Sequence, residues 1–284
     1  MDALTVPSPT ANAALDGVVA PINYLVPGAD KPFSYTYEPP PGTPWRNTVY
    51  APFPMAVRDA RALAAAPTLD DAGFTLVGHD SAVRDFHDEA GRRAAYDPEV
   101  ERLVAALTGA AKVVVFDHTL RDGRLQARAA DGVREPVKRA HNDYTPRSAP
   151  QRVRDILSAE EAGRRLRDRY AIVNVWRPIG GVVEESPLAI ADARSVAFDD
   201  FVASDLIYRD RRGETYGVRH NPAHRWYHYP SMRPDEALVF KCFDSAEDGR
   251  ARWTAHAAFD DPTTSPSAAP RRSVETRTLA FWEP

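Results

Sequence analysis

The stretch Tyr170-Ala-Ile-Val-Asn-Val-Trp176 decides the fold, because it begins a long series of short β-strands. Apolar and β-branched residues dominate it, as is typical of a strand with a buried face. Seven similar segments follow at intervals of roughly 10–18 residues, separated by Pro, Gly or Asp clusters. Such a series predicts a sandwich or barrel, and we expect an antiparallel double-sheet jelly roll. The seven segments are Leu188–Ala191, Asp205–Tyr208, Thr215–Arg219, Arg225–Tyr229, Ala237–Phe243, Thr254–Phe259 and Val274–Trp282.

The part of the chain before this series mixes strands with helices. The 25 prolines of the chain are spread over the whole sequence, which indicates many short elements and not one linker. We therefore expect a single domain over residues 1–284, in which residues 1–135 pack on a jelly-roll core formed by residues 136–284. The predicted strands are Ile22–Leu25, Ser34–Tyr37, Phe74–Val77 and Val113–Phe116, and the predicted helices are Ser81–Ala90, Pro98–Leu107 and Pro150–Arg169.

The composition limits the functional class. Of the 284 residues, 43% are hydrophobic and 27% are charged, as in an ordinary globular protein. The formal net charge of −4 provides no basic field that would attract nucleic acid. Cys242 is the only cysteine, and its apolar surroundings predict a buried thiol in a reducing compartment. The N-terminus lacks a signal-peptide pattern and no window approaches the ~20 apolar residues of a membrane span, so we expect a cytoplasmic protein without membrane contact.

The motif His141-Asn-Asp143 and the distant His256 supply the candidate metal ligands. Residues two apart in a strand point to the same face, so His141 and Asp143 can hold one ion together. Two imidazoles and one carboxylate form the facial triad that binds Fe(II) and leaves positions open for an oxidant and a co-substrate. Two other interpretations stay open: a loop whose His and Asp face solvent, and a core histidine at position 256.

A basic strand follows His256. Arg271, Ser273, Glu275 and Arg277 alternate along it and therefore share one face. Buried guanidinium groups need an anion, and a dicarboxylate co-substrate would supply one, because arginine binds a carboxylate through two parallel hydrogen bonds. The alternatives are an edge strand with exposed charges and an internal salt bridge to Glu275.

Polar and aromatic residues provide candidates for further ligand contacts. Asn174 and Trp176 share one face of their strand, and their amide and indole N–H suit either a polar ligand or structural hydrogen bonds. The histidines between His220 and Tyr229 stand around Pro222, which indicates a loop and pocket residues in preference to a second metal site. The predicted substrate pocket consists of Tyr144, Trp176, His220, Trp226 and Tyr227, with the Pro- and aromatic-rich segment Tyr35–Trp45 over the open face.

Nine short motifs then identify a family resemblance: Ala20-Pro-Ile-Asn-Tyr24, Asp117-His-Thr-Leu-Arg121, His141-Asn-Asp143, Val173-Asn-Val-Trp-Arg-Pro178, Pro187-Leu-Ala-Ile-Ala-Asp192, Arg225-Trp-Tyr227, Phe240-Lys-Cys-Phe-Asp244, His256-Ala-Ala-Phe259 and Pro270-Arg-Arg-Ser-Val-Glu-Thr-Arg277. In these motifs the chain resembles the hydroxylase/desaturase family that includes the cephamycin 7α-methoxylation component, gibberellin desaturase-like proteins and fungal endoperoxide-forming oxygenases of meroterpenoid pathways. The resemblance covers nearly the whole chain. One departure is Arg272, which stands where an acidic residue is expected.

This resemblance implies a mainly β fold with flanking helices, built on a double-stranded β-helix, that is, a cupin-like jelly-roll core. It also implies Fe(II), 2-oxoglutarate and O2 as cofactor and co-substrates. The metal triad carries over to His141, Asp143 and His256. The positions that carry over as 2-oxoglutarate contacts are Arg271, Arg277, Ser273 and Asn174.

The function implied by the resemblance is hydroxylation or desaturation of a small secondary metabolite, with oxidative decarboxylation of 2-oxoglutarate to succinate and CO2. One alternative is an iron oxygenase that forms an endoperoxide or rearranges a scaffold. The contrasting alternative is a non-catalytic binding protein on the same jelly roll. The expected partners are a small-molecule substrate and, as one option, a second copy of the chain in a homodimer.

Overall fold

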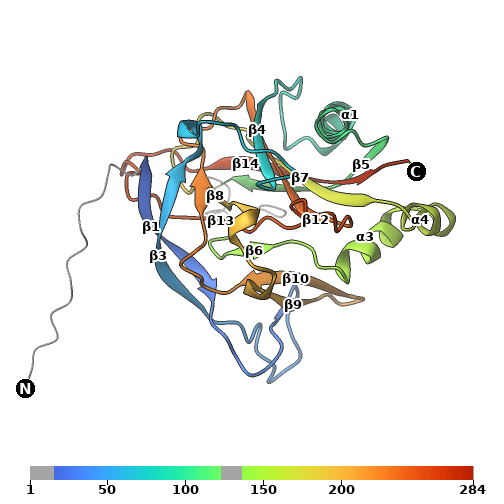
Figure 1. Cartoon of the computed structure of the whole chain (residues 1–284), viewed down its shortest axis with the longest axis horizontal. Helices are drawn as coiled ribbons and strands as arrows, with labels where there is room; N and C mark the ends of the chain where they lie inside the picture. Colours follow the sequence, from blue (N-terminus) through green and yellow to red (C-terminus); the bar gives the residue numbers. More distant parts are fainter. Residues whose placement is uncertain (1–15, 123–135, 284) are drawn as a thin grey trace, which may run out of the picture.

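The computed structural model describes residues 16–122 and 136–283, which contain two β-sheets packed face to face (Figure 1). Neighbouring strands are antiparallel except for the pairs β3–β11 and β2–β9. Sheet A has the order β1 (Gly17–Leu25), β3 (Tyr50–Asp59), β11 (Trp226–His228), β8 (Leu188–Ala191), β13 (His256–Ala258), β6 (His141–Asn142), β10 (Arg212–Val218), β9 (Phe201–Ile207) and β2 (Phe33–Tyr35). Sheet B has the order β4 (Phe74–Gly78), β12 (Glu236–Asp244), β7 (Tyr170–Pro178), β14 (Arg272–Phe281) and β5 (Lys112–Asp122).

The facing sides of the two sheets enclose the main core. Each of the eight strands predicted from Tyr170 onward is present, with ends shifted by a few residues, and the predicted mainly β jelly-roll class is confirmed. Inward-facing side chains alternate along the strands, as the pleat requires. We call the resulting set of buried side chains the inner cluster; its large members include Phe74, Trp176, Ile190, Tyr227, Leu238, Phe240 and Leu279.

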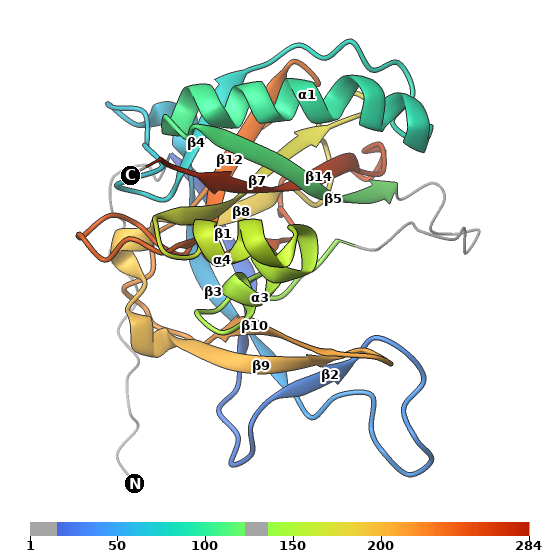
Figure 2. The ribbon, with the colours of Figure 1, turned by 90° about the vertical axis from the view of Figure 1, so that its right-hand side faces the viewer.

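Helix α1 (Glu89–Thr108) covers the outer face of sheet B (Figure 2). Its buried residues Val100 and Val104 belong to the same apolar cluster as Val173 and Val175 of β7. The helix begins nine residues before the predicted start at Pro98 and contains that proline. It ends at Gly109, whose positive φ of 70° is a conformation that glycine adopts without strain.

Two helix predictions are wrong in detail. Residues 81–88 form no helix; Ser81 Oγ and the backbone N–H of Ala82 instead donate hydrogen bonds to the Glu99 carboxylate of α1. The single helix predicted over Pro150–Arg169 is two helices, α3 (Ser148–Ile156) and α4 (Ala159–Arg165). The break falls at Ser158, whose side chain accepts a hydrogen bond from the N–H of Glu161 and so begins a new helix.

The outer face of sheet A has its own apolar core, which we call the outer cluster. It contains Tyr24, Val57, Ala191, Trp226 and Phe259 among its members. Strand β1 closes over this cluster: the backbone N–H of Ala140 donates to the carbonyl of Asn23 at 2.8 Å. The sequence analysis missed β3, because prolines interrupt its pattern. Proline has no backbone N–H to donate in a sheet. Pro54 is tolerated because its partner in β1 is also a proline, Pro21, so no hydrogen bond is expected between the two residues.

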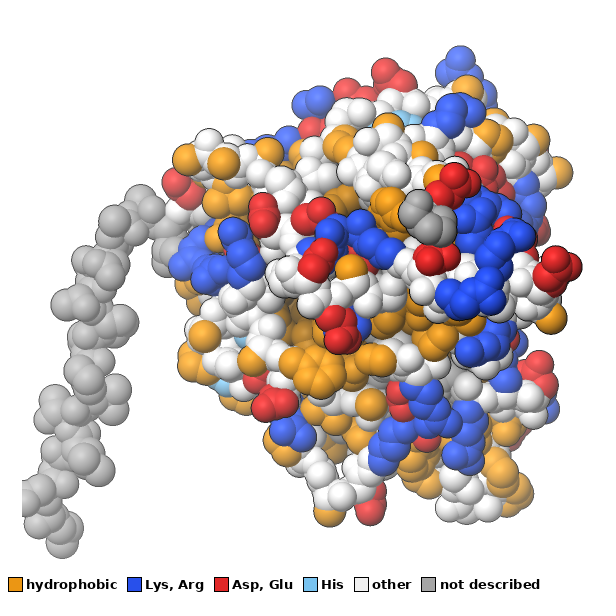
Figure 3. Space-filling view, turned by 45° about the vertical axis from the view of Figure 1, so that its right-hand side comes forward, with side chains coloured by type: hydrophobic (Ala, Val, Ile, Leu, Met, Phe, Trp, Pro, Cys, Tyr) orange, Lys and Arg blue, Asp and Glu red, His pale blue; other side chains and the backbone are white. Residues whose placement is uncertain are grey.

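The molecular surface mixes both signs of charge. Figure 3 shows Lys and Arg side chains interspersed with Asp and Glu over the face in view, with apolar side chains exposed between them. Among the described residues, no helix combines the length and apolar character needed to cross a membrane.

Candidate metal and co-substrate site

Two neighbouring strands of sheet A bring the candidate metal ligands together. His141 begins β6 and lies directly opposite His256, which begins β13, so both imidazoles project from the same face. Asp143 follows β6 immediately. One ligand atom from each of these residues lies within 4.8 Å of the other two, and the imidazole centroids are 4.3 Å apart. Three donors at this separation can bind a single ion.

Backbone carbonyls orient both imidazoles. Nδ1 of His141 bonds to the carbonyl of Arg139 at 2.8 Å, and Nδ1 of His256 bonds to that of Thr254 at 3.0 Å. A carbonyl only accepts, so Nδ1 carries the proton and Nε2 presents the lone pair with which imidazole binds metals. Burial and the neighbouring His256 lower the pKa of His141 to about 3, and this effect outweighs the rise caused by Asp143. The low pKa keeps the His141 ring neutral near pH 7.

Asp143 is held by two donors from sheet B. Its Oδ2 accepts hydrogen bonds from Asn174 Nδ2 at 3.0 Å and from Arg277 Nε at 2.8 Å. Oδ1 lies 3.7 Å from Nε2 of His141 and is thus the oxygen turned toward the other ligands. Burial raises the pKa of Asp143, but the positive charge of Arg277 and its hydrogen bond lower it by more, and the net pKa lies well below its usual range. The carboxylate is therefore ionised.

Arg277 has protein acceptors for all three of its nitrogens. Besides Asp143, its Nη1 donates to Asp117 at 2.7 Å and to Thr119 at 2.8 Å, and its Nη2 lies 2.5 Å from Glu275 Oε1. The internal salt bridge to Glu275 that the sequence left open is therefore present. Its guanidinium is directed at the candidate ligand Asp143, whereas the contact with 2-oxoglutarate expected of Arg277 stays a prediction.

Arg271 differs from Arg277 in having few partners. It is only 5% exposed and its guanidinium stacks over the Trp176 ring at 5.5 Å. Nη1 donates to the carbonyl of Ser186, whereas Nε has no hydrogen-bond partner within the described parts of the chain. Burial and the nearby charge of Arg121 lower the pKa of Arg271 to about 9. A buried cation in this state is stabilised by an anion.

Four buried polar atoms at the site lack a hydrogen-bond partner within residues 16–122 and 136–283. Buried polar groups are paired in the great majority of cases, so unpaired atoms gathered in one place indicate a ligand site. Sheet A contributes one of them, inward-facing positions of sheet B contribute two, and the residue directly before β14 contributes the fourth. They are His256 Nε2, Asn174 Oδ1, Ser273 Oγ and Arg271 Nε.

Three of the five predicted pocket residues belong to the inner cluster. Tyr144 follows Asp143 directly, and Trp176 lies beneath Arg271. Tyr227 pairs with Ile190, which also pairs with His256, so Tyr227 projects from the ligand face of sheet A. Tyr144, Trp176 and Tyr227 thus lie on the same side of the sheets as the ligands.

The other two pocket predictions are wrong. Trp226 precedes Tyr227 and therefore points to the opposite face, where its Nε1 donates to Tyr24 Oη at 2.6 Å in the outer cluster. His220 stacks on Phe53 at 4.0 Å and lies beside the same tyrosine. The aromatic run had suggested one pocket, but strand alternation divides it between two faces.

The sequence analysis also missed residues of β5 that border the site. Asp117 and Thr119 both bind Arg277 from this strand. They pair with Arg277 and Glu275 in the β5–β14 register. The available signal was their spacing of two residues, which places both on one face of a strand.

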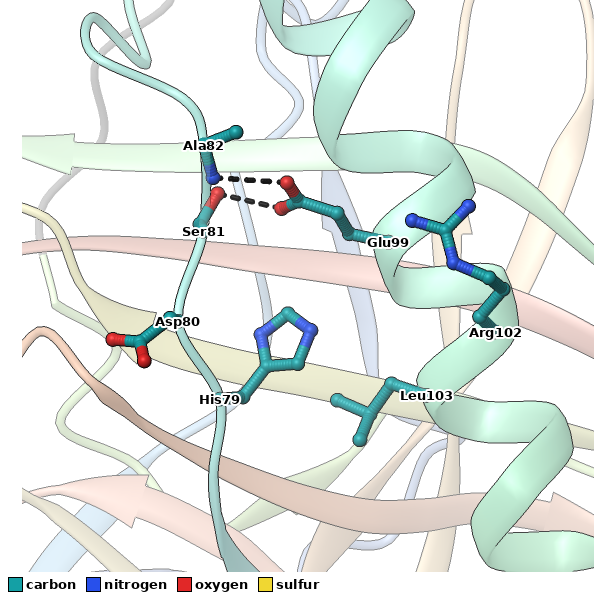
Figure 4. Close-up of a pocket in the computed structure, with 7 residues that line it drawn as sticks. All are labelled: His79, Asp80, Ser81, Ala82, Glu99, Arg102 and Leu103. Carbon is teal, nitrogen blue, oxygen red and sulfur yellow. Dashed lines mark hydrogen bonds between the residues drawn. The ribbon is translucent and has the colours of Figure 1, made fainter.

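A separate hollow of about 630 Å³ lies outside sheet B, between α1 and the segment after β4 (Figure 4). Arg177, which projects from β7 on the face opposite to Trp176, contacts His79 Nδ1 of this hollow at 3.1 Å. Sheet B therefore separates the hollow from the candidate metal ligands. Its lining residues are His79, Asp80, Ser81, Ala82, Glu99, Arg102 and Leu103.

Comparisons with known proteins agree over most of the chain. A family model described as an oxidoreductase/YMDC permease-like domain matches residues 22–281. The hydroxylase/desaturase efuI of Hormonema carpetanum is 33% identical over 252 residues, which cover 81% of this chain and 84% of that protein. The alpha-ketoglutarate-dependent dioxygenase phiK of a fungal species is 35% identical over 222 residues, or 75% of this chain and 79% of that protein.

Solved structures extend this agreement to the fold. The iron and alpha-ketoglutarate-dependent endoperoxidase NvfI is 26% identical, with a TM-score of 0.84 and coverage of 94% of this chain and 98% of its own. Two imidazoles and a carboxylate between the sheets of a jelly roll are typical of non-heme iron oxygenases. The chain belongs to the family of iron- and 2-oxoglutarate-dependent hydroxylases and desaturases, which confirms the resemblance carried by its motifs.

Proposed function

We propose that this protein uses Fe(II), 2-oxoglutarate and O2 to hydroxylate or desaturate a small secondary metabolite. The proposal rests on one observation: the space between the two sheets contains two sets of polar groups that need a ligand. Lone pairs of His141 and His256 gather with Asp143, while Arg271 and Ser273 present unpaired polar atoms. The first set suits a divalent metal and the second suits a carboxylate. A 2-oxo dicarboxylate satisfies both sets with its two ends.

His141, Asp143 and His256 would hold the metal. Their donor set of two nitrogens and one oxygen is the one preferred by non-heme Fe(II) sites. Bound Fe(II) with 2-oxoglutarate supplies O2 activation, so that decarboxylation to succinate and CO2 is coupled to oxidation of a substrate C–H bond. The chain contributes His141 as a neutral imidazole and Asp143 as an ionised carboxylate, so neither of these two ligands need lose a proton when a metal arrives near pH 7.

Arg271 is the residue that we assign to the far carboxylate of 2-oxoglutarate. Its guanidinium is buried, stacked on Trp176, and short of one acceptor. The stacking fixes the plane of the donors before the ligand arrives, which lowers the entropy lost on binding. Ser273 Oγ, also unpaired and on the same face of β14, would donate to the same carboxylate.

Arg277 and Asn174 act as positioning residues in this proposal. Both donate to Oδ2 of Asp143, so that Oδ1 is the oxygen left for the metal. Glu275 accepts from Asn174 at 3.1 Å and pairs with Arg277, which fixes both donors. Such partners hold a metal ligand in one orientation and raise metal affinity.

A second candidate activity is endoperoxide formation or scaffold rearrangement. The structural similarity to the endoperoxidase NvfI favours it, since the same ligand set would serve either outcome. Substrate contacts from Tyr144, Trp176 and Tyr227 would decide between the outcomes by placing different substrate atoms beside the metal. A non-catalytic binding role is disfavoured by the complete ligand triad and its complete set of supporting hydrogen bonds.

The domain prediction is also retained as a proposal. Strands from before and after residue 135 share both sheets, which supports one domain over residues 1–284. The division into residues 1–135 and 136–284 thus describes the order of the sequence and not two folding units. Location in the cytoplasm, the homodimer, and the lack of nucleic-acid and membrane partners stay predictions from the sequence.

The decisive experiment is anaerobic titration of the purified protein, first with Fe(II) and then with 2-oxoglutarate. We expect one Fe(II) per chain and 2-oxoglutarate binding that requires the metal. Product analysis with candidate metabolites would then separate hydroxylation, desaturation and endoperoxide formation. A protein that binds no Fe(II), or consumes no 2-oxoglutarate in air with any candidate, would contradict the proposal.

A further inference from the structure

A glycine makes room beside the candidate metal ligand His141. Gly217 of β10 lies directly opposite His141, so a side chain at this position would project from the ligand face of sheet A. A Cβ placed there would lie 3.0 Å from Cδ2 of Leu25 and 3.3 Å from Oη of Tyr50. The side chains of Leu25 and Tyr50 therefore fill the space beside His141 that β10 leaves open.

Tyr50 brings a phenol without a protein partner to this position. The residue begins β3, pairs with Leu25 of β1, and is half-buried. No hydrogen bond joins its hydroxyl to any residue that the structure describes. In contrast, the hydroxyl of Tyr24 is bonded to both Trp226 and His224. Tyrosine hydroxyls usually find a hydrogen-bond partner when they are buried, and this half-buried one has none among the described residues, so it is available to a ligand.

Arg139 supplies a cation next to this phenol. Its guanidinium lies 5.8 Å from the centroid of the Tyr50 ring, and its backbone carbonyl is the acceptor that orients His141. Within residues 16–122 and 136–283, its half-buried guanidinium has neither a hydrogen-bond acceptor nor a carboxylate in ion-pair range. Arg277, on the other side of the ligands, has three carboxylate neighbours. The charge of Arg139 is thus uncompensated at close range.

Arg46 adds a second positive charge near the Tyr50 hydroxyl. Burial raises the pKa of Tyr50, and the charges of Arg139 and Arg46 oppose the rise. Both guanidinium groups are therefore close enough to act on the phenol oxygen. An oxygen anion in contact with the Tyr50 hydroxyl would be stabilised by the same two charges.

We propose that Arg139 and Tyr50 form a subsite that binds a carboxylate of the substrate, with Leu25 as the apolar wall for its hydrophobic part. The enzyme would then oxidise a carboxylate-bearing metabolite held beside His141. This inference rests on the proposed function, which places the metal next to that residue. Arginine offers two parallel N–H donors and tyrosine one O–H donor, a set that matches a carboxylate. A neutral amide in its place would leave the arginine charge unmatched.

The test uses the full chain under anaerobic conditions with Mn(II) and saturating 2-oxoglutarate, so that the Arg271 site is filled. The probes are 1-naphthoate and its neutral analogue 1-naphthamide, with dissociation constants from calorimetry. We expect Arg139→Gln to weaken naphthoate binding at least about tenfold and Tyr50→Phe to weaken it by about threefold to tenfold, as for a lost charge-assisted hydrogen bond. The affinity for naphthamide should stay unchanged in both variants.

Arg209→Gln is the matched control. The guanidinium of Arg209 also stacks on a tyrosine, Tyr37, at 4.8 Å. It follows the end of β9, and it is not opposite a candidate ligand. This variant should bind both probes like the unmodified protein. An equal loss of naphthoate affinity in Arg209→Gln and Arg139→Gln would overturn the subsite.

Binding of 2-oxoglutarate separates this inference from the proposed function. If the unmodified protein binds 2-oxoglutarate with Mn(II) but does not bind naphthoate, or if Arg139→Gln binds naphthoate as tightly as the unmodified protein, the subsite is wrong and the proposed function stands. If the unmodified protein does not bind 2-oxoglutarate with metal, the proposed function itself is wrong. Retained 2-oxoglutarate binding in Arg139→Gln also shows that this variant is folded around its ligands.

Discussion

Glu275 forms a 2.5 Å ion pair with Arg277, the residue whose Nε holds the candidate ligand Asp143. The same Oε1 accepts a hydrogen bond from Asn174, the second donor to Asp143. Glu275 therefore controls both donors although it does not touch the ligand carboxylate. It also compensates the charge of Arg277, whereas Arg271 keeps an Nε without a hydrogen-bond partner among the described residues.

Glu275→Gln should weaken Fe(II) binding by about 10–100-fold, as expected when a residue that supports a metal ligand is changed. The substitution removes the charge that fixes Arg277 but keeps the size of the side chain. Anaerobic Fe(II) titration would measure the effect. The matched control is Glu236→Gln, which alters another buried carboxylate that pairs with Arg61. Equal Fe(II) affinities in Glu275→Gln and Glu236→Gln would contradict the positioning role.

Arg271→Gln and Arg277→Gln should impair different steps, the first the binding of 2-oxoglutarate and the second the binding of Fe(II). Arg271→Gln should raise the KM for 2-oxoglutarate, with a loss of about 2–5 kcal/mol for an unpaired buried carboxylate, and leave Fe(II) binding nearly unchanged. Arg277→Gln should chiefly weaken Fe(II) binding, because its Nε holds Asp143. Steady-state kinetics in 2-oxoglutarate and metal titrations of both variants test this. If Arg271→Gln keeps the normal KM, the anchor is assigned to the wrong residue.

Replacement of any of the three candidate ligands by Ala should abolish turnover and Fe(II) binding. Three protein donors are the minimum for this type of site, and Asp143 contributes the only negative charge among them. Metal content after anaerobic reconstitution and 2-oxoglutarate consumption are the two measurements. Stoichiometric Fe(II) with near-normal activity in Asp143→Ala would refute the triad.

Trp226 and Tyr227 should respond differently although they are adjacent. Trp226→Ala removes a buried ring of the outer cluster and should cost about 3–5 kcal/mol of the free energy of unfolding without changing the products. Tyr227→Phe should alter the product distribution or increase decarboxylation without substrate oxidation, since its side chain shares the face of His256. A melting curve and a product profile on both variants decide. Altered products in Trp226→Ala with an unchanged melting temperature would contradict the assignment of that ring to the outer cluster.

The sequence predicted the strands and the ligand motif because both are expressed in local spacing. Strand β8 was predicted at its observed bounds, and the spacing of two between His141 and Asp143 indicated one face. The pairing of β6 with β13 was not predictable from spacing, because it is set by the long-range arrangement of the sheets. The family resemblance supplied that step.

The errors arose where tertiary contacts override local pattern. The aromatic run at Trp226 looks continuous in the sequence, yet alternation sends its rings to two separate cores. The prolines of β3 conceal a strand that is stabilised by pairing with β1. Residues of the inferred subsite, Tyr50 and Arg139, carry no motif at all. They are brought together only when β1, with its partner β3, packs against the segment that precedes β6.

The adjacency of His141 and His256 also determines when iron can be acquired. On the ribosome, β6 with His141 and Asp143 emerges first, and six further strands are synthesised before β13. A nascent chain therefore contains only two of the three candidate ligands until β13, which carries His256, has been synthesised. Metal binding is thermodynamically coupled to the folded arrangement of its ligands. We therefore expect iron to load after synthesis, and we expect chains that end before β13 to assemble no centre able to react with O2.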